Sequence, residues 1–335
     1  MLKKLILLVV TVFFAAVNSF GLTVQLEAVQ NDLVAQRYKA AKDNLRMVLS
    51  QNPTDIEALY LQLAVCQTEI LDYESYNTDG KRFIATADSV KEIIEKRMTL
   101  LHGKDSVMCL FYLANVYGGI SVMQAKTGEW LDGAKNGMAS VELLRQVQKA
   151  EPDFLAANLG VGLFNYYFGS SLNWLPFSGR RVNEGLCDIE AATQSEFPFN
   201  YAAKNSLCWI LIDKQEYTRA DSVAVSVLNS YPNNTIFLRI RSIIDLRSGA
   251  YKNAIEHANQ LLQLTKERAP RNWSDLVAAY YILVESYSLN GQVSESLVAA
   301  DTILGQNIPQ AYLSVPHIKK NLKRIRDIKE KMCEK

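Results

Sequence analysis

Apolar residues recur every three or four positions in long stretches of the chain, and the strict alternation of apolar and polar residues that is typical of strands is missing. Leucine, alanine, lysine and glutamate dominate these stretches, and all four favour helices. The pattern is plainest near the end of the chain. It predicts an amphipathic helix over residues 314–333 from six apolar positions, namely Val315, Ile318, Leu322, Ile325, Ile328 and Met332. The spacing therefore predicts an all-α protein.

A short motif returns at a fixed spacing. Tyr217–Ala220 reads Tyr-Thr-Arg-Ala, and Tyr251–Ala254, 34 residues later, reads Tyr-Lys-Asn-Ala. An earlier copy, Tyr38–Ala41, reads Tyr-Lys-Ala-Ala, and Pro53 and Pro232 each lie fifteen residues after the tyrosine of their own copy. A period of 34 residues predicts a stack of helix pairs, because one pair cannot cover its own apolar face.

Each motif position has a physical reason. A small side chain at Ala41, Ala220 and Ala254 lets two helices approach closely, and the aromatic residue three positions earlier covers the contact. Gly249 supplies the turn before Tyr251. The prolines end the second helix of a pair, because proline cannot continue the ladder of backbone hydrogen bonds.

These positions make the chain resemble the tetratricopeptide repeat family, whose pattern places glycine, an aromatic residue, alanine and proline at these relative positions. The resemblance is close at 37–60 and at 201–264 and looser elsewhere. It implies a right-handed superhelical solenoid of about seven antiparallel helix pairs over residues 20–335. The amphipathic helix at 314–333 would then cap the stack and keep its end soluble.

Two further copies of the motif depart from the pattern. One has Gly291, Val293, Ser296 and Ala300, set back by an insertion at Lys266–Trp273. The other ends at Pro152 and keeps a small residue at Ser140, but it has Gly137 where the aromatic residue is expected. Degenerate copies are normal in repeat proteins, so both support the same architecture.

The N-terminus predicts a secretory signal peptide over residues 1–19. Lys3 and Lys4 precede an uncharged run of thirteen residues, Leu5–Val17, which is too short to span a bilayer and ends in small or polar residues. We expect cleavage after Ser19, and retention as an anchor is the alternative. The mature protein would be exported, and either periplasmic or secreted.

Composition narrows the choice of partners. The whole chain has 36 basic and 35 acidic residues, and loss of the signal peptide would leave 34 and 35, so we expect no nucleic-acid partner. The five cysteines include no Cys-x-x-Cys pair and give no sign of a disulfide framework. The three histidines lie far apart without ligand spacing, so we expect no metal and no cofactor.

Aligning the chain with the repeat pattern predicts a groove lined by the first helix of each pair. Its candidate partner-binding residues are Tyr60, Asn205, Trp209, Arg239, Tyr281 and Glu285. Aromatic groups would supply contact area, and arginine or asparagine would supply hydrogen bonds to a peptide. The alternative is that the aromatic residues pack between repeats.

A long loop between helices is predicted at 168–181. Trp174 and Phe177 would form an apolar finger for a partner or a membrane, and Arg180 and Arg181 would bind a carboxylate or phosphate beside it. The alternative is a plug that folds back on the aromatic residues before it.

The sequence therefore favours an exported scaffold or adaptor that binds a protein or peptide without catalysis. One alternative is a secreted α/α-barrel enzyme that processes carbohydrate, for which Glu184, Asp188 and Glu190 are the crowded acids closest to aromatic residues. Another is a membrane-associated assembly factor whose basic C-terminal helix makes a peripheral contact with anionic lipid.

Overall fold

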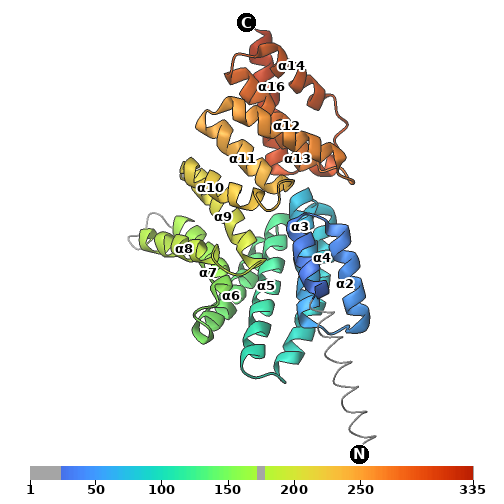
Figure 1. The fold of residues 1–335 in the computed structure, drawn as a ribbon, viewed down its shortest axis with the longest axis vertical. Coiled ribbons are helices and arrows are strands. Elements are labelled where there is room, and N and C mark those ends of the chain that lie inside the picture. Colours follow the sequence, from blue (N-terminus) through green and yellow to red (C-terminus); the bar gives the residue numbers. More distant parts are fainter. Residues whose placement is uncertain (1–23, 172–177, 335) are drawn as a thin grey trace, which may run out of the picture.

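The fold is all-α, as the spacing of apolar residues predicts. The computed structural model describes residues 24–171 and 178–334, and within these ranges every regular element is a helix (Figure 1). The signal peptide predicted at 1–19 lies outside the described residues.

The helices follow one another as antiparallel pairs, each packed on the next along the chain. A helix over residues 24–34 shares a small apolar core with α2 (Tyr38–Gln51) and α3. The later pairs are α3 (Ile56–Tyr73) with α4 (Tyr76–Met98), α5 (Lys104–Thr127) with α6 (Trp130–Ala150), α7 (Asn158–Ser171) with α8 (Ser178–Ala192), α9 (Phe199–Asp213) with α10 (Tyr217–Leu228), α11 (Thr235–Ser248) with α12 (Tyr251–Glu267), and α13 (Trp273–Leu289) with α14 (Val293–Leu304). A 3-10 turn, η1 (Leu155–Ala157), precedes α7, and the short α15 (Gln310–Leu313) precedes α16 (Pro316–Cys333). The last helix packs on α13 and α14 through Ile318, Leu322, Ile325 and Ile328. The fold is thus a tetratricopeptide-like helical repeat.

The repeat register is confirmed at its small residues. Ala41, Ala220 and Ala254 are each 0% exposed, and their helices α2, α10 and α12 begin at the tyrosine three residues earlier. Pro53 lies two residues after the end of α2 and Pro232 four residues after the end of α10, in the connections that lead to the next pair. The motif therefore sets both the packing of a pair and its length.

The turn inside a pair has one backbone geometry in all six pairs whose turn the structure describes. The residue two positions before the second helix has a positive φ in each of them, namely Gln36 at 59°, Glu74 at 52°, Gly128 at 93°, Gln215 at 62°, Gly249 at 83° and Gly291 at 80°. This left-handed conformation suits glycine and strains any other residue. Three of the six turns therefore carry glutamine or glutamate at some cost in backbone energy.

The loop predicted at 168–181 is shorter than expected. Residues 168–171 belong to α7 and residues 178–181 to α8. The two helices pack closely, because a Cβ on Gly162 would lie 2.8 Å from the carbonyl oxygen of Gly185. Near the tip of the hairpin, the Arg181 guanidinium lies 4.9 Å from the ring centre of Phe168. These contacts extend both helices into the segment that the sequence assigned to a loop.

Helix α5 is long and apolar enough to cross a membrane by length and composition alone, with a mean hydropathy of 1.5 over Asp105–Thr127. Half of that stretch is buried inside the fold, where α5 packs on α3, α4 and α6. Gly137, which stands where the repeat pattern expects an aromatic residue, lies on α6 where α6 packs on α5. A Cβ at Gly137 would be 3.0 Å from Oγ of Ser121 on α5. The apolar surface of α5 therefore serves the core.

The stack also closes on itself. Helix α3, in the first part of the chain, lies against α13 near its end, as Figure 1 shows where the blue and brown helices meet. An open solenoid makes contacts only between neighbouring repeats. The contact between α3 and α13 joins parts of the chain about 200 residues apart.

Candidate functional site

A buried polar cluster, which we call the clasp, joins the two ends of the stack. Two of its residues come from the first repeats: Gln36 lies in the turn before α2, and Asp72 lies near the end of α3. The others come from α11, the α12–α13 loop and α13. The clasp consists of Gln36, Asp72, Thr235, Arg268, Asn272 and Asp275.

Asp72 is the centre of the clasp. Its Oδ2 accepts hydrogen bonds from Nη2 of Arg268, Nε2 of Gln36 and the hydroxyl of Tyr38, each at 2.8 Å. Asn272 donates to the main-chain oxygen and to Oδ1 of Asp72, each at 3.1 Å. The side chain of Asp72 is 0% exposed, so its charge is compensated wholly by these donors.

Thr235 forms hydrogen bonds to both Gln36 and Asp275. Its backbone N–H donates to Oε1 of Gln36 at 2.8 Å, and its hydroxyl donates to Oδ2 of Asp275 at 2.7 Å. Two further hydrogen bonds flank this contact, from Asn234 Nδ2 to the main-chain oxygen of Val34 at 2.7 Å and from the Tyr231 hydroxyl to Oδ1 of Asn31 at 3.0 Å. The start of α11 is therefore fastened to the turn before α2.

Asp275 is the second buried carboxylate. Nη1 of Arg239 lies 2.8 Å from its Oδ1, and Nη1 of Arg268 lies 3.6 Å from its Oδ2. Burial raises the pKa of Asp275, while the two guanidinium groups act against that rise. The clasp and the adjacent Arg239 together are balanced in charge, because two arginines face two aspartates.

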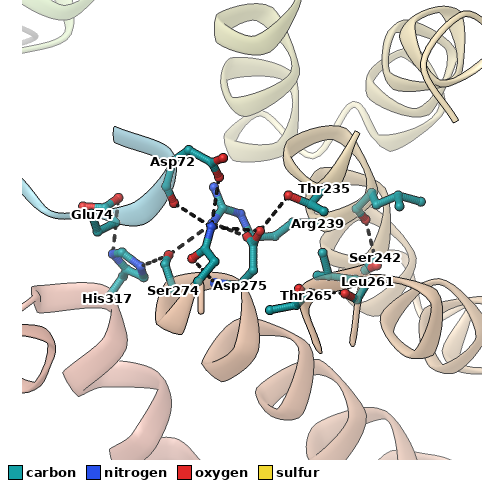
Figure 2. A network of polar contacts seen from close by, with 12 residues as sticks. Asp72, Glu74, Thr235, Arg239, Ser242, Leu261, Thr265, Ser274, Asp275 and His317 are labelled. Atoms are coloured by element: carbon teal, nitrogen blue, oxygen red, sulfur yellow. Dashed lines mark hydrogen bonds and ion pairs between the residues drawn. The ribbon is translucent and has the colours of Figure 1, made fainter. Parts of the chain in front are cut away.

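A polar arm leads from the clasp to α16 (Figure 2). Arg239 donates to Oγ of Ser274 at 3.2 Å, and that oxygen lies 3.0 Å from Nε2 of His317. Glu74 lies beyond, 3.9 Å from Nδ1 of His317 and 3.6 Å from Nζ of Lys126 on α5. Burial, with Arg239 and Lys126 nearby, lowers the pKa of His317 to about 4, so its ring is neutral at pH 7.

A cleft of about 460 Å³ lies beside the clasp. Helices α2, α3 and α4 form one side, and Pro270 of the α12–α13 loop and Tyr312 of α15 form the other. Tyr73, next to Asp72 in the sequence, lines the cleft, and the Arg268 guanidinium lies 4.8 Å from its ring centre. Clasp and cleft therefore share the end of α3 and the α12–α13 loop.

The lining of the cleft mixes apolar and polar groups. Leu63, Ile70 and Phe83 are buried beneath it, and the hydroxyls of Ser75, Thr78 and Thr86 stand around it. Its charges are paired within the lining, Lys42 with Glu69 and Arg82 with Asp79. Burial raises the pKa of the Cys66 thiol, which makes it a poor nucleophile at neutral pH.

Three of the predicted groove residues lie in the packing between repeats or close to it. Tyr60 stacks on Tyr112 of α5 with ring centres 4.6 Å apart, and burial raises its pKa. Trp209 on α9 is half-buried and packs against the main core, and Asn205 is half-buried on the same helix. The alternative of aromatic packing between repeats thus describes Tyr60 and Trp209.

The other three predicted groove residues are engaged within the chain. Arg239 lies beside the clasp and forms an ion pair with Asp275, one of the clasp residues. Glu285 pairs with Arg324 of α16 at 2.8 Å, and burial together with the nearby Glu285 raises the pKa of Tyr281. Helix α16 therefore covers the part of the groove where Tyr281 and Glu285 were expected to meet a partner.

The predicted finger lies partly outside the described residues, which include neither Trp174 nor Phe177. Arg180 is exposed and pairs with Glu184 one turn away at 2.8 Å. Arg181 lies against Phe168 and 3.4 Å from Oδ1 of Asn165. Both arginines are thus engaged with their own helix hairpin.

The acids considered for a carbohydrate-processing enzyme lie along α8. Glu184 and Glu190 take part in surface ion pairs with Arg180 and Arg219, at 2.8 and 2.6 Å. Burial, and the nearby Glu184, raise the pKa of Asp188. In residues 24–171 and 178–334, no three side chains of His, Cys, Asp or Glu are grouped as metal ligands.

The sequence analysis missed both the clasp and the cleft. One signal was available, since the insertion at Lys266–Trp273 contains Arg268, Pro270 and Asn272. An insertion in a helical stack is often functional. Nothing in the sequence indicated that Asp72 would meet it, because α4 and four complete helix pairs separate the two segments.

No protein-family model and no curated protein sequence matches the chain. Solved structures with similar folds include the C-terminal part of a TPR repeat-containing protein from Cytophaga hutchinsonii, with 15% identity, a TM-score of 0.41, and coverage of 89% of this chain and 98% of that one. The TPR2AB domain of yeast Sti1 in a pHSP90 complex has 11% identity, a TM-score of 0.33, and coverage of 94% and 99%. The TPR domain of P58(IPK) has 12% identity, a TM-score of 0.28, and coverage of 93% and 99%.

Proposed function

We propose that the protein is a non-catalytic scaffold that binds a segment of a partner protein in the cleft between α2–α4 and the α12–α13 loop. The observation that carries this proposal is the cleft itself, because its volume of about 460 Å³ falls in the range of ligand-binding pockets. Pro270 and Tyr312 approach from the far end of the chain to complete it. Two parts of the stack therefore contribute to one site.

The chemistry of the cleft favours binding over catalysis. Apolar side chains give contact area, and hydroxyl groups around them offer hydrogen bonds to a peptide backbone. The Cys66 thiol, whose pKa is raised, is a weak nucleophile, and the carboxylates of Glu69 and Asp79 are held by Lys42 and Arg82.

Site-specific photo-crosslinking tests this function in native cells. A photo-reactive residue at Thr86, which lines the cleft, is compared with one at Ser89, which is exposed on the same helix outside it. The partner identified at Thr86 is then purified and its affinity measured with the T86W and S89W variants. We expect T86W to abolish binding and S89W to leave it unchanged. Equal crosslinking at both positions, or full binding by T86W, contradicts the proposal.

Export completes the proposed function, and the support for it is the basic start and apolar run of residues 1–19. The mature protein then begins at or near Phe20. Mass spectrometry of the protein isolated from its native cells measures this directly. A chain that retains Met1–Ser19 rules out cleavage.

A second candidate function is peripheral membrane contact through α16. Lys319, Lys320 and Lys323 are exposed on its outer face and form no ion pair with another described residue. Co-sedimentation with anionic vesicles, compared with neutral vesicles, tests it. Binding that disappears when the three lysines are changed to alanine favours this function, and equal sedimentation with both kinds of vesicle contradicts it.

A further inference from the structure

The clasp and the cleft are built from the same two chain segments. On one side, Asp72 of the clasp and Tyr73 of the cleft are consecutive residues at the end of α3. On the other side, Pro270 of the cleft lies between Arg268 and Asn272 of the clasp. Any movement that separates the α12–α13 loop from α3 therefore breaks the hydrogen bonds of the clasp and removes a wall of the cleft together.

We propose that the cleft binds an extended, uncharged stretch of polypeptide with a large apolar side chain. Binding of this ligand and closure of the adjacent clasp each favour the other. This inference rests on the proposed function and adds to it the class of ligand and its linkage to the closed form of the stack. The ligand stabilises closure because only the closed form presents both walls.

The class of ligand follows from the lining. Leu63, Ile70 and Phe83 offer an apolar surface for one large side chain. The two basic groups of the lining, Lys42 and Arg82, are paired with its two acidic groups, so the lining has no net charge and offers a charged ligand no unpaired counter-charge. The hydroxyls of Thr78 and Thr86 donate to the main-chain oxygens of Ser75 and Arg82, and their own oxygens can still accept hydrogen bonds from peptide N–H groups.

The clasp is suited to reversible opening because its contacts are polar. Water can replace hydrogen bonds when a polar surface separates, whereas an apolar surface loses the whole benefit of burial. The balanced charges of Asp72, Asp275, Arg239 and Arg268 also make the closed register specific. Thr235 provides a reporter, because its amide hydrogen is held by Gln36 of the first repeats.

The first part of the test identifies ligands. A random-peptide phage library is selected on the wild-type protein, and the selected sequences are made as synthetic peptides. We expect uncharged peptides with one large apolar residue, and we expect T86W to abolish their binding while S89W leaves it unchanged. These two positions match well, because each hydroxyl bonds the carbonyl oxygen four residues earlier on the exposed side of α4.

The second part tests linkage with matched glutamines. Gln36 and Gln215 have the same left-handed backbone at equivalent turns, and Gln215 is exposed and makes no side-chain hydrogen bond to a clasp residue. We expect Q36A to weaken peptide binding on the order of tenfold, because it leaves clasp groups without partners and lowers the closed population. Q215A changes the affinity by less than about twofold. In the wild type, saturating peptide slows hydrogen exchange at the Thr235 amide by at least about tenfold.

The outcomes separate the two proposals. Peptides that T86W still binds show that the cleft is not the site, which overturns both the proposed function and this inference. Peptides that T86W excludes but Q36A binds normally, with unchanged exchange at Thr235, overturn the linkage alone and leave the proposed function standing. Selected peptides that are strongly charged overturn the class of ligand. Circular dichroism of each variant confirms that the helices remain.

Discussion

The backbone N–H of Thr235 donates a hydrogen bond to Oε1 of Gln36 at 2.8 Å, although 199 residues separate the two. Thr235 is the first residue of α11, where the backbone N–H groups have no acceptor within the helix. Its neighbour Asn234 caps Phe237 in the ordinary way. The helix therefore receives one cap from its own sequence and one from the opposite end of the stack.

Replacing Gln36 by alanine removes this second cap. The Thr235 amide and one oxygen of Asp72 lose a partner in a buried place, so we expect the free energy of unfolding to fall by about 1–3 kcal/mol. Q215A keeps the same strained backbone without a clasp and changes stability by less than about 0.5 kcal/mol. Urea unfolding of both variants measures the difference. Equal losses would mean that the bond between Gln36 and Thr235 contributes nothing to stability.

Arg239 is expected to be a structural residue. Its side chain is 15% exposed and pairs with the fully buried Asp275, so R239A should lower the free energy of unfolding by about 3–5 kcal/mol. Arg241 on the same helix pairs with Asp221 at 3.0 Å, but both side chains are about one-third exposed. R241A should therefore cost less than about 1 kcal/mol. Similar thermal melts for the two variants would contradict the role assigned to the buried pair.

Leucine at Ala220 or Ala254 should overpack a contact between helices. Both alanines are fully buried, and each replacement should cost about 1–3 kcal/mol. Ala202 is exposed on α9, so A202L serves as the control and should stay within about 0.5 kcal/mol of the wild type. Melting temperatures measured by calorimetry test the set. If A220L and A254L melt like A202L, these positions do not set the helix spacing.

Acid should weaken the fold through His317. Its pKa is lowered from an ordinary 6.5 to about 4, so between these values the unfolded chain binds more protons and stability falls as the pH drops. The ring is 40% exposed, which limits the size of the effect. Glu74 and Asp275 have raised pKa values and act in the opposite direction over their own range.

H317Q separates these contributions, because it keeps a partner for Ser274 and leaves Glu74 and Asp275 in place. We expect the wild type to lose more stability than H317Q between pH 7 and pH 4.5, as followed by urea unfolding at each pH. Parallel losses in the two proteins would show that protonation of His317 has no part in acid sensitivity.

The sequence predicted the local structure well, because each repeat contact lies within a few tens of residues. Ala220 and Ala254 are buried where the 34-residue period places them, and Gly249 forms the expected turn. The loop at 168–181 was predicted too long, because the contact between Phe168 and Arg181 depends on side chains that face each other only in the folded hairpin.

The site was harder to predict, for a physical reason. The repeat register predicts that Arg239 lies on the groove side of α11, but it does not reveal that Asp275 pairs with it. The contact between Asp72 and Arg268 depends on the summed rotation of the helices α4 to α12 that lie between them, and small errors in each step accumulate. Gln36 and Gln215 illustrate the limit, because identical residues in identical turns have different surroundings.

The clasp also fixes the size of the molecule. An open helical array gains or loses a repeat at its middle with little effect on the rest, since every unit touches only its neighbours. Here an added or deleted helix pair between α3 and α11 would carry Thr235 and the α12–α13 loop away from Gln36 and Asp72. The number of helix pairs is therefore fixed by the closed assembly. A chain with one pair more would lose the clasp and form an open stack.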